Sequence, residues 1–153
     1  MRILEYFSLN GAEQARVREA IGRSDWRAAA YLREKLERGE LRALYGESTR
    51  VLLGTEGDRL AAFCTLAERD DVADTVLTPW IGFVYVFPAY RGCRRSGELI
   101  ESACALARRD GHLCVYLSSR EDGLYEKYGF EFVEAVRDAW GEATRVYRRA
   151  LAP

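Results

Sequence analysis

Apolar side chains recur at helical spacing in three parts of the chain, each with a start or stop signal. Asn10 and Glu13 form a capping box, which predicts that a helix begins there. Ser24 can cap a second helix that ends near Gly39. Residues 94–110 form the longest helical pattern, with apolar positions three and four residues apart. The chain should therefore contain two early helices and one central helix.

Seven apolar runs of strand length lie around these helices. They are residues 2–7, 50–55, 59–66, 80–87, 113–117, 130–136 and 144–149. The run 80–87 is apolar on both faces, which predicts a central strand that is buried on both sides. The helix 94–110 joins it to the run 113–117, and this order predicts a parallel pair with a right-handed crossover. A short helix is expected over 119–128, and the last two runs should form a C-terminal hairpin.

Together these elements predict an α/β fold of the α+β kind, with a mixed sheet that helices cover on both faces. No repeat, low-complexity run or Pro-rich linker interrupts the pattern. The chain has 153 residues and is 48% apolar, which is enough for one core. Residues 1–153 are therefore expected to form a single domain.

The charge balance narrows the class of ligand. The formal net charge is −1 and the pI is about 6.0, so no overall basic field attracts nucleic acid or an anionic membrane. No apolar run reaches the roughly 18 residues of a membrane span, and the N-terminus has no signal-peptide organisation. The four cysteines form no CxxC pair and only one histidine accompanies them, so no metal site is expected. A cytoplasmic chain with reduced thiols is the simplest interpretation.

A local basic cluster lies between the central strand and the helix that follows it. The segment from Pro88 to Gly97 carries three arginines and two glycines. Unpaired amides at a helix N-terminus, together with the positive end of the helix dipole, suit a phosphate. Taken alone, the segment is equally consistent with an anion-binding cradle and with a solvated, arginine-rich turn.

Two motifs on either side of the crossover resemble the GNAT superfamily of N-acetyltransferases. The first is the strand Phe83-Val-Tyr-Val86 with the loop Pro88-Ala-Tyr-Arg-Gly92, and the second is Leu124-Tyr-Glu-Lys-Tyr-Gly-Phe130. The resemblance is best over residues 80–135. It implies a mostly antiparallel seven-stranded sheet with helices on both faces, a central parallel βαβ unit and a C-terminal hairpin. It also implies acetyl-CoA as cosubstrate and a primary amine of a small molecule or peptide as acceptor.

The resemblance assigns roles to particular residues. The strand before the loop would pair with the pantetheine arm, and an amide near Tyr85 would polarise the thioester carbonyl. Tyr125 would be the general acid for the leaving thiolate, because a phenol is protonated at neutral pH; the alternative is an aromatic that only packs. Arg94 and Ser96 replace the small residues that are usual in the family's loop. The implied cofactor-binding residues are Phe83, Val84, Tyr85, Val86, Arg91, Gly92, Cys93, Arg94, Arg95, Ser96, Gly97 and Ser119.

The residue that takes the amine proton is not singled out by the sequence. The acidic loop before the central strand offers Glu68, Asp70, Asp71 and Asp74, although for each one taken singly a position in a solvated, charged loop is the more frequent case. If this loop flanks the acceptor, it favours a cationic amine. The resemblance also allows a homodimer, with the C-terminal hairpin as the contact.

Two other functions stay open at the level of sequence. One is a non-catalytic acyl-CoA-binding module of the same fold, which the replacements at Arg94 and Ser96 motivate. The other is a nucleotide-binding protein of another class that shares only the strand, loop and helix. Neither the dinucleotide-binding glycine motif nor the P-loop motif is present, which makes this the weaker alternative.

Overall fold

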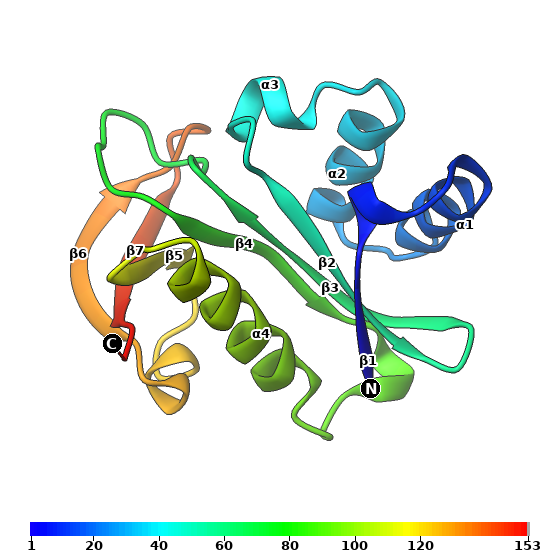
Figure 1. Cartoon of the computed structure of the whole chain (residues 1–153). Coiled ribbons are helices and arrows are strands. Elements are labelled where there is room, and N and C mark those ends of the chain that lie inside the picture. The colour runs from blue at the N-terminus through cyan, green and yellow to red at the C-terminus, as the bar shows by residue number, and fades with distance from the viewer. Residues whose placement is uncertain (153) are drawn as a thin grey trace.

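The computed structural model describes residues 1–152 and shows seven strands in the order β1-β2-β3-β4-β5-β7-β6, with helices on both faces (Figure 1). The strands are β1 (Arg2–Glu5), β2 (Arg50–Glu56), β3 (Arg59–Ala67), β4 (Trp80–Val86), β5 (Cys114–Ser119), β6 (Glu131–Arg137) and β7 (Ala143–Ala150). The helices are α1 (Gly11–Gly22), α2 (Arg27–Glu37), α3 (Leu41–Tyr45) and α4 (Arg95–Arg109). Three 3-10 turns, η1 (Tyr6–Ser8), η2 (Pro88–Tyr90) and η3 (Tyr125–Tyr128), complete the order.

The middle of the sheet opens into a V. β4 and β5 are parallel and pair at Trp80 with Tyr116 and at Ile81 with Leu117. Within the described residues they make no further pairs, although β4 continues to Val86 and β5 to Ser119. The C-terminal halves of the two strands therefore diverge, and backbone groups that face the V are left without a strand partner.

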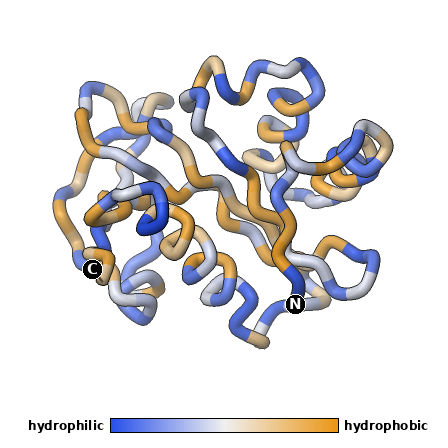
Figure 2. Tube along the Cα trace, viewed as in Figure 1, coloured by the Kyte–Doolittle hydropathy of each residue, from blue (hydrophilic) through white to orange (hydrophobic). Residues whose placement is uncertain are grey.

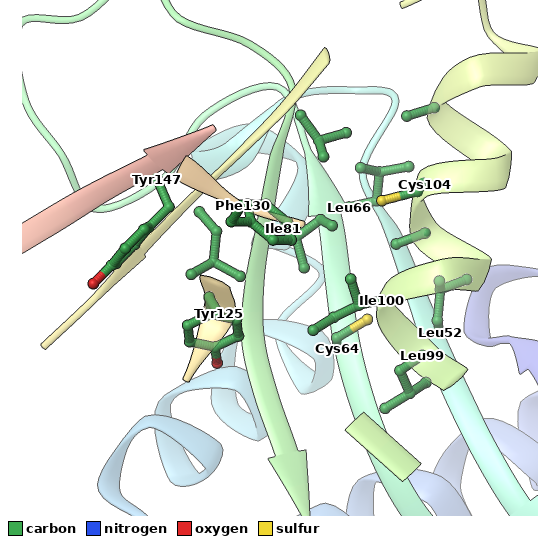
Figure 3. Close-up of a cluster of buried hydrophobic side chains, with 14 of the residues drawn as sticks. Leu52, Cys64, Leu66, Ile81, Leu99, Ile100, Cys104, Tyr125, Phe130 and Tyr147 are labelled. Atoms are coloured by element: carbon green, nitrogen blue, oxygen red, sulfur yellow. The ribbon is translucent and has the colours of Figure 1, made fainter. Parts of the chain in front are cut away.

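The two faces of the sheet carry separate apolar cores. Hydrophobic residues follow the central strands in Figure 2, and the alternation of side chains sends them to opposite faces. The α4 face buries, among others, Leu52, Cys64, Ile81, Leu99 and Ile100 (Figure 3). The face covered by α1, α2 and α3 buries, among others, Ile21, Leu32, Tyr45, Phe63 and Tyr85. Each side chain of β4 and β5 can therefore be assigned to one side of the V.

The predicted architecture is confirmed in its main features. The seven strands, the parallel pair, the crossover helix and the C-terminal hairpin are all present. The capping box is also present, with the Asn10 side chain accepting from the amide of Glu13 and the Glu13 side chain accepting from the amide of Asn10. These elements carry strong local signals, so pattern alone was sufficient to locate them.

Two local predictions are wrong, and one element of the structure was not predicted. The helix cap at Ser24 is wrong, because Ser24 Oγ accepts from the amide of Trp26 at 3.0 Å and α2 begins after that turn without a side-chain cap. The helix over 119–128 is wrong, because Ser119 ends β5 and only η3 is helical in that segment. α3 is an addition, since its five residues are too few to show helical periodicity.

Candidate active site

β4 contains a bulge on the edge that faces β3. Thr65 pairs with Gly82 and Phe63 with Tyr85, so a single residue of β3 faces two residues of β4 between these pairs. Phe83 takes a left-handed conformation there, with φ +49°, which is uncommon for an aromatic residue. A bulge disrupts the ladder locally and re-aims the side chains beside it. The strand expected to pair with a pantetheine arm is therefore irregular where it enters the V.

The loop that follows η2 opens α4 with an uncapped N-terminus. The first helical hydrogen bond runs from the amide of Glu98 to the carbonyl of Arg94 at 3.1 Å, so the amides of residues 95–97 point out of the helix end. Arg94 is the N-cap residue and makes no side-chain cap. The free amides and the helix dipole together fit a phosphate.

Two residues of this loop, Gly92 and Arg94, have a positive φ, although only one of them is glycine. Arg94 has φ +59° and ψ +29°, the left-handed region in which glycine has no steric penalty. Gly92 has φ +84°, and an added Cβ there would meet no atom within 4 Å. Arg94 therefore takes the conformation that suits a glycine at this position, and its side chain adds local strain.

The arginines of the loop point in different directions. Arg91 donates from Nε to the carbonyl of Val86 at 3.0 Å, and its guanidinium lies 5.5 Å from the centre of the Tyr85 ring. Arg95 pairs with Glu56 of β2 at 2.7 Å, so it anchors the start of α4 to the sheet. Arg94 is exposed, and of the three it is the one whose side chain is free to turn toward an anion at the helix end.

Ser96 and Gly97 connect the loop to η3. The hydroxyl of Ser96 and that of Tyr128 lie 3.0 Å apart and share a hydrogen bond. An added Cβ at Gly97 would lie 3.0 Å from Cε1 of Tyr128, so only glycine lets the ring pack this closely. The small residues at these positions therefore join the first turn of α4 to η3, and Cys93 stands exposed beside them.

Tyr125 lies on the α4 face of the V, directly after the loop that leaves β5. The residue is 8% exposed, and its ring contacts the rings of Phe130 and Tyr147 at centroid distances of 6.1 and 6.2 Å. Figure 3 shows its hydroxyl oxygen turned away from both of these rings. Burial raises the pKa of Tyr125 to about 12, and the Glu121 carboxylate adds to that rise. The phenol therefore keeps its proton at neutral pH.

Asp70 lies on the opposite face of the V and spans its opening. Its Oδ2 accepts from the hydroxyl of Ser118 on β5 at 2.6 Å. On the β4 side, an added Cβ at Gly82 would lie 3.0 Å from Asp70 Oδ1, so the glycine leaves room for the carboxylate. Burial raises the pKa of Asp70 to about 6, although the Ser118 hydrogen bond opposes the rise. A carboxylate with this pKa suits proton transfer near neutral pH.

The structure separates the four acidic candidates. Asp71 lies beside Asp70, accepts from the hydroxyl of Tyr45 at 2.8 Å, and has a pKa raised by burial. Glu68 accepts from the amide and hydroxyl of Ser48, and these bonds lower its pKa. Asp74 is exposed on the same loop. Only Asp70 bridges the two central strands.

The sequence prediction missed Ser118 and Tyr45, which hold the two carboxylates. Ser118 lies one residue beyond the predicted end of its strand, and a longer strand would have placed it on the same face as Tyr116. Tyr45 belongs to α3, which gave no helical pattern. A cavity of about 460 Å³ lies within the segment 68–80 and is lined in part by Asp70.

Two features are absent from the part of the chain that the structure describes. Among residues 1–152, no group of three or more His, Cys, Asp or Glu side chains is placed to hold a metal ion. In the same part of the chain, no helix has the length and apolar character of a membrane span.

Comparisons with known structures agree with this fold. The aminoglycoside 6'-N-acetyltransferase of Enterococcus faecium superposes with a TM-score of 0.72 at 13% identity, covering 100% of this chain and 98% of its own. An acetyltransferase of Streptococcus agalactiae gives 0.66 at 19% identity and 98% coverage of both chains. A GNAT family acetyltransferase of Elizabethkingia anophelis with acetyl-CoA bound gives 0.59 at 15% identity, covering 73% and 82% of the two chains. A search of curated proteins found no match.

The superpositions establish the fold only, and the family is shown by a match to a sequence profile. The profile of the acetyltransferase (GNAT) domain matches residues 47–132, from just before β2 into β6. That range is more than half of the chain and contains the bulged strand, the uncapped helix end, Asp70 and Tyr125. The chain therefore belongs to the GNAT acetyltransferase family.

Proposed function

We propose that the protein transfers the acetyl group of acetyl-CoA to a primary amine of a small molecule or peptide at the V between β4 and β5. One observation carries the proposal: Asp70 and Tyr125 flank this V from opposite faces, with pKa values that suit a base and an acid. The acetyl-CoA bound in the Elizabethkingia anophelis structure and the aminoglycoside acceptor named for the Enterococcus faecium enzyme support the two substrates.

The first part of the proposal concerns the acyl donor. Bound acetyl-CoA supplies an activated thioester carbonyl. The amides of residues 95–97 and the side chain of Arg94 hold its pyrophosphate, and Arg91, Gly92 and Cys93 shape the loop around it. The backbone from Phe83 to Val86 aligns the pantetheine arm, with an amide near Tyr85 directed at the carbonyl oxygen. Ser119 closes the opposite edge of the V at the end of β5.

The second part concerns the protons. An acceptor that arrives as an ammonium ion first releases one proton to solvent. Asp70, ionised above pH 6, then takes one proton from the nitrogen of the neutral amine as the C–N bond forms. Tyr125 gives one proton to the sulfur as the C–S bond breaks. The acceptor enters from the face of α1, α2 and α3, and the thiol leaves on the face of α4. Each residue thus moves one proton, and the two are restored by exchange with solvent.

The setting of the enzyme is also part of the proposal. We take residues 1–153 as one domain that works in the cytoplasm. A homodimer through the C-terminal hairpin is supported by β6, an edge strand whose Phe132 and Val133 are 49% and 44% exposed.

Thermal unfolding tests the binding half of the proposal. Acetyl-CoA, CoA, ATP and NAD are compared at equal concentration, and a ligand at 100 times its Kd adds about 2.7 kcal/mol of stability. Only the two CoA species should raise the melting temperature. An equal shift with ATP or NAD, or no shift with either CoA species, would overturn the proposal.

Release of free thiol tests the transfer half, with mass spectrometry of the acetylated amine. Tyr125→Phe should lower kcat by about 10²- to 10⁴-fold while the KM for acetyl-CoA stays within twofold. Tyr6→Phe is the matched control, because it removes a buried hydroxyl, bonded to Arg18, from the far part of the α1 face. Equal kcat values for the two variants would contradict the role of Tyr125.

A further inference from the structure

Three aromatic side chains from distant parts of the chain meet on the acceptor side of the V. Tyr31 of α2 lies parallel to Phe83 of β4, with ring centroids 6.4 Å apart and an interplanar angle of 7°. Trp140, from the turn between β6 and β7, meets Tyr31 edge-on at 6.1 Å. We call these three residues the aromatic wall.

Tyr45 joins the aromatic wall to the carboxylates. Its ring contacts Phe83 edge-on at 5.8 Å, and its hydroxyl donates to Asp71 at 2.8 Å. Asp70 adjoins the residue before Phe83, because it occupies the space over Gly82. One end of the wall is therefore acidic and lies at the V, and the other end is the exposed ring of Trp140.

The turn that carries Trp140 is held in place, although the residue itself is 65% exposed. The Asp138 carboxylate accepts from the amide of Trp140 at 2.9 Å, which fixes the turn. The amide of Ala139 donates to the carbonyl of Asp71 at 2.8 Å, and Val72 bridges to Asp138, so the turn is tied to the acidic loop. An exposed tryptophan on an anchored turn offers a large contact surface at low entropic cost.

The charges around the wall differ between its two ends. Asp70 and Asp71 lie at the inner end. Charged side chains farther along the wall are paired with one another. Lys35 lies 5.2 Å from the centre of the Tyr31 ring and pairs with Glu40 at 3.8 Å, and Asp138 of the Trp140 turn pairs with Arg120 at 3.7 Å. Arg137 donates to the carbonyl of Gly141, next to Trp140. No ion pair among the described residues includes Asp70 or Asp71, so the inner end favours one positive charge, whereas a second charge along the wall would meet carboxylates that already have a cation partner.

We infer that the acceptor is an arylalkylamine, a primary amine carried on a flat apolar body. Its nitrogen lies at Asp70 and Asp71, and its ring lies on the aromatic wall, with Trp140 as the main contact. The inference rests on the proposed function and adds the class of the acceptor. It also sets this site apart from one for a polyamine, which needs unpaired acidic groups along its whole length.

Acetylation of three amines tests the inference. With 2-phenylethylamine, butylamine and spermidine as acceptors, kcat/KM for 2-phenylethylamine should exceed each of the others by about tenfold. Trp140→Leu should bring the ratio of 2-phenylethylamine to butylamine to within about twofold of unity, because leucine keeps apolar bulk without a ring. Trp140→Phe is the matched control and should keep most of the ratio. Preference for spermidine, or a ratio that Trp140→Leu leaves unchanged, would overturn the inference.

A binding measurement separates this inference from the proposed function. Calorimetry of 2-phenylethylamine with the CoA-loaded protein should give a Kd that Trp140→Leu raises about tenfold and Trp140→Phe raises less than threefold. Equal Kd values for all three proteins overturn the inference even if butylamine is acetylated, in which case the proposed function stands. If the protein neither binds acetyl-CoA nor turns over any amine, the proposed function is wrong. The same calorimetric comparison, made then without CoA, still tests whether the aromatic wall binds the ring of the amine.

Discussion

Replacing Arg94 by glycine separates the backbone strain of the loop from its charge. Arg94 has φ +59°, and a left-handed conformation costs a residue with a side chain about 1–2 kcal/mol. Glycine removes this cost but loses about 0.5–1 kcal/mol through the entropy of the unfolded chain. Arg94→Gly should therefore gain about 0.5–1 kcal/mol of stability over Arg94→Ala, which keeps the strain. In a chain of 153 residues this raises the melting temperature by about 1–4 °C.

Both substitutions at Arg94 remove the same charge and should weaken the binding of CoA equally. The side chain is exposed, so its pairing with a phosphate is screened and contributes about 0.5–1 kcal/mol, or a two- to fivefold change in Kd. Calorimetry at low and high salt measures this change, which should shrink as salt rises. If Arg94→Gly is no more stable than Arg94→Ala, the strain argument fails. If neither variant alters the Kd for CoA, the pairing of Arg94 with phosphate is refuted.

Two further substitutions test Asp70 and the packing of the helix end. The pKa of Asp70 rises from about 3.9 in the unfolded chain to about 6, so the folded state holds the proton longer and stability falls as pH rises from 4 to 6. In Asp70→Asn, the fall of kcat/KM below about pH 6 that wild type shows should be absent. Urea unfolding should show that the stability of Asp70→Asn relative to wild type improves between pH 4.5 and 7. If the stability of the two proteins depends on pH in the same way, the assignment of this pKa to Asp70 is wrong. Gly97→Ala should cost about 1–3 kcal/mol and weaken CoA binding, because its Cβ would meet the Tyr128 ring at 3.0 Å. Gly11→Ala is the matched control, because no atom lies within 4 Å of the new Cβ, and it should be neutral or slightly stabilising in urea unfolding. Equal losses of stability in the two variants would contradict the packing argument.

The parts of the fold that local pattern determines could be predicted from the sequence. β4 is apolar on both faces and α4 carries a strict helical repeat, so the crossover between β4 and β5 followed directly. The cap at Ser24 could not be judged in the same way, since a serine near a helix start serves either the helix or the turn before it. Only the path of the backbone at Trp26 distinguishes the two.

The site was predictable where one segment builds it and not where several segments meet. The start of α4 lies in one stretch of sequence, and Tyr125 lies in one motif. Asp70 differs from the other acidic residues of its loop only through Gly82 and Ser118, which belong to two strands that the sheet brings to it. The aromatic wall likewise joins residues from α2, β4 and the turn after β6. Such contacts depend on tertiary packing, which periodicity does not report.

Single-turnover acetyl transfer from acetyl-CoA, followed by mass spectrometry of the amine, tests the central claim most directly. Wild type should convert bound acetyl-CoA to acetylated amine and free thiol in equal amounts. Tyr125→Phe and Asp70→Asn should each bind acetyl-CoA with a Kd within about twofold of wild type and transfer the group at least about 100-fold more slowly. Saturable binding of acetyl-CoA by wild type without any transfer to an amine would contradict the account and leave a protein that binds acyl-CoA without catalysis.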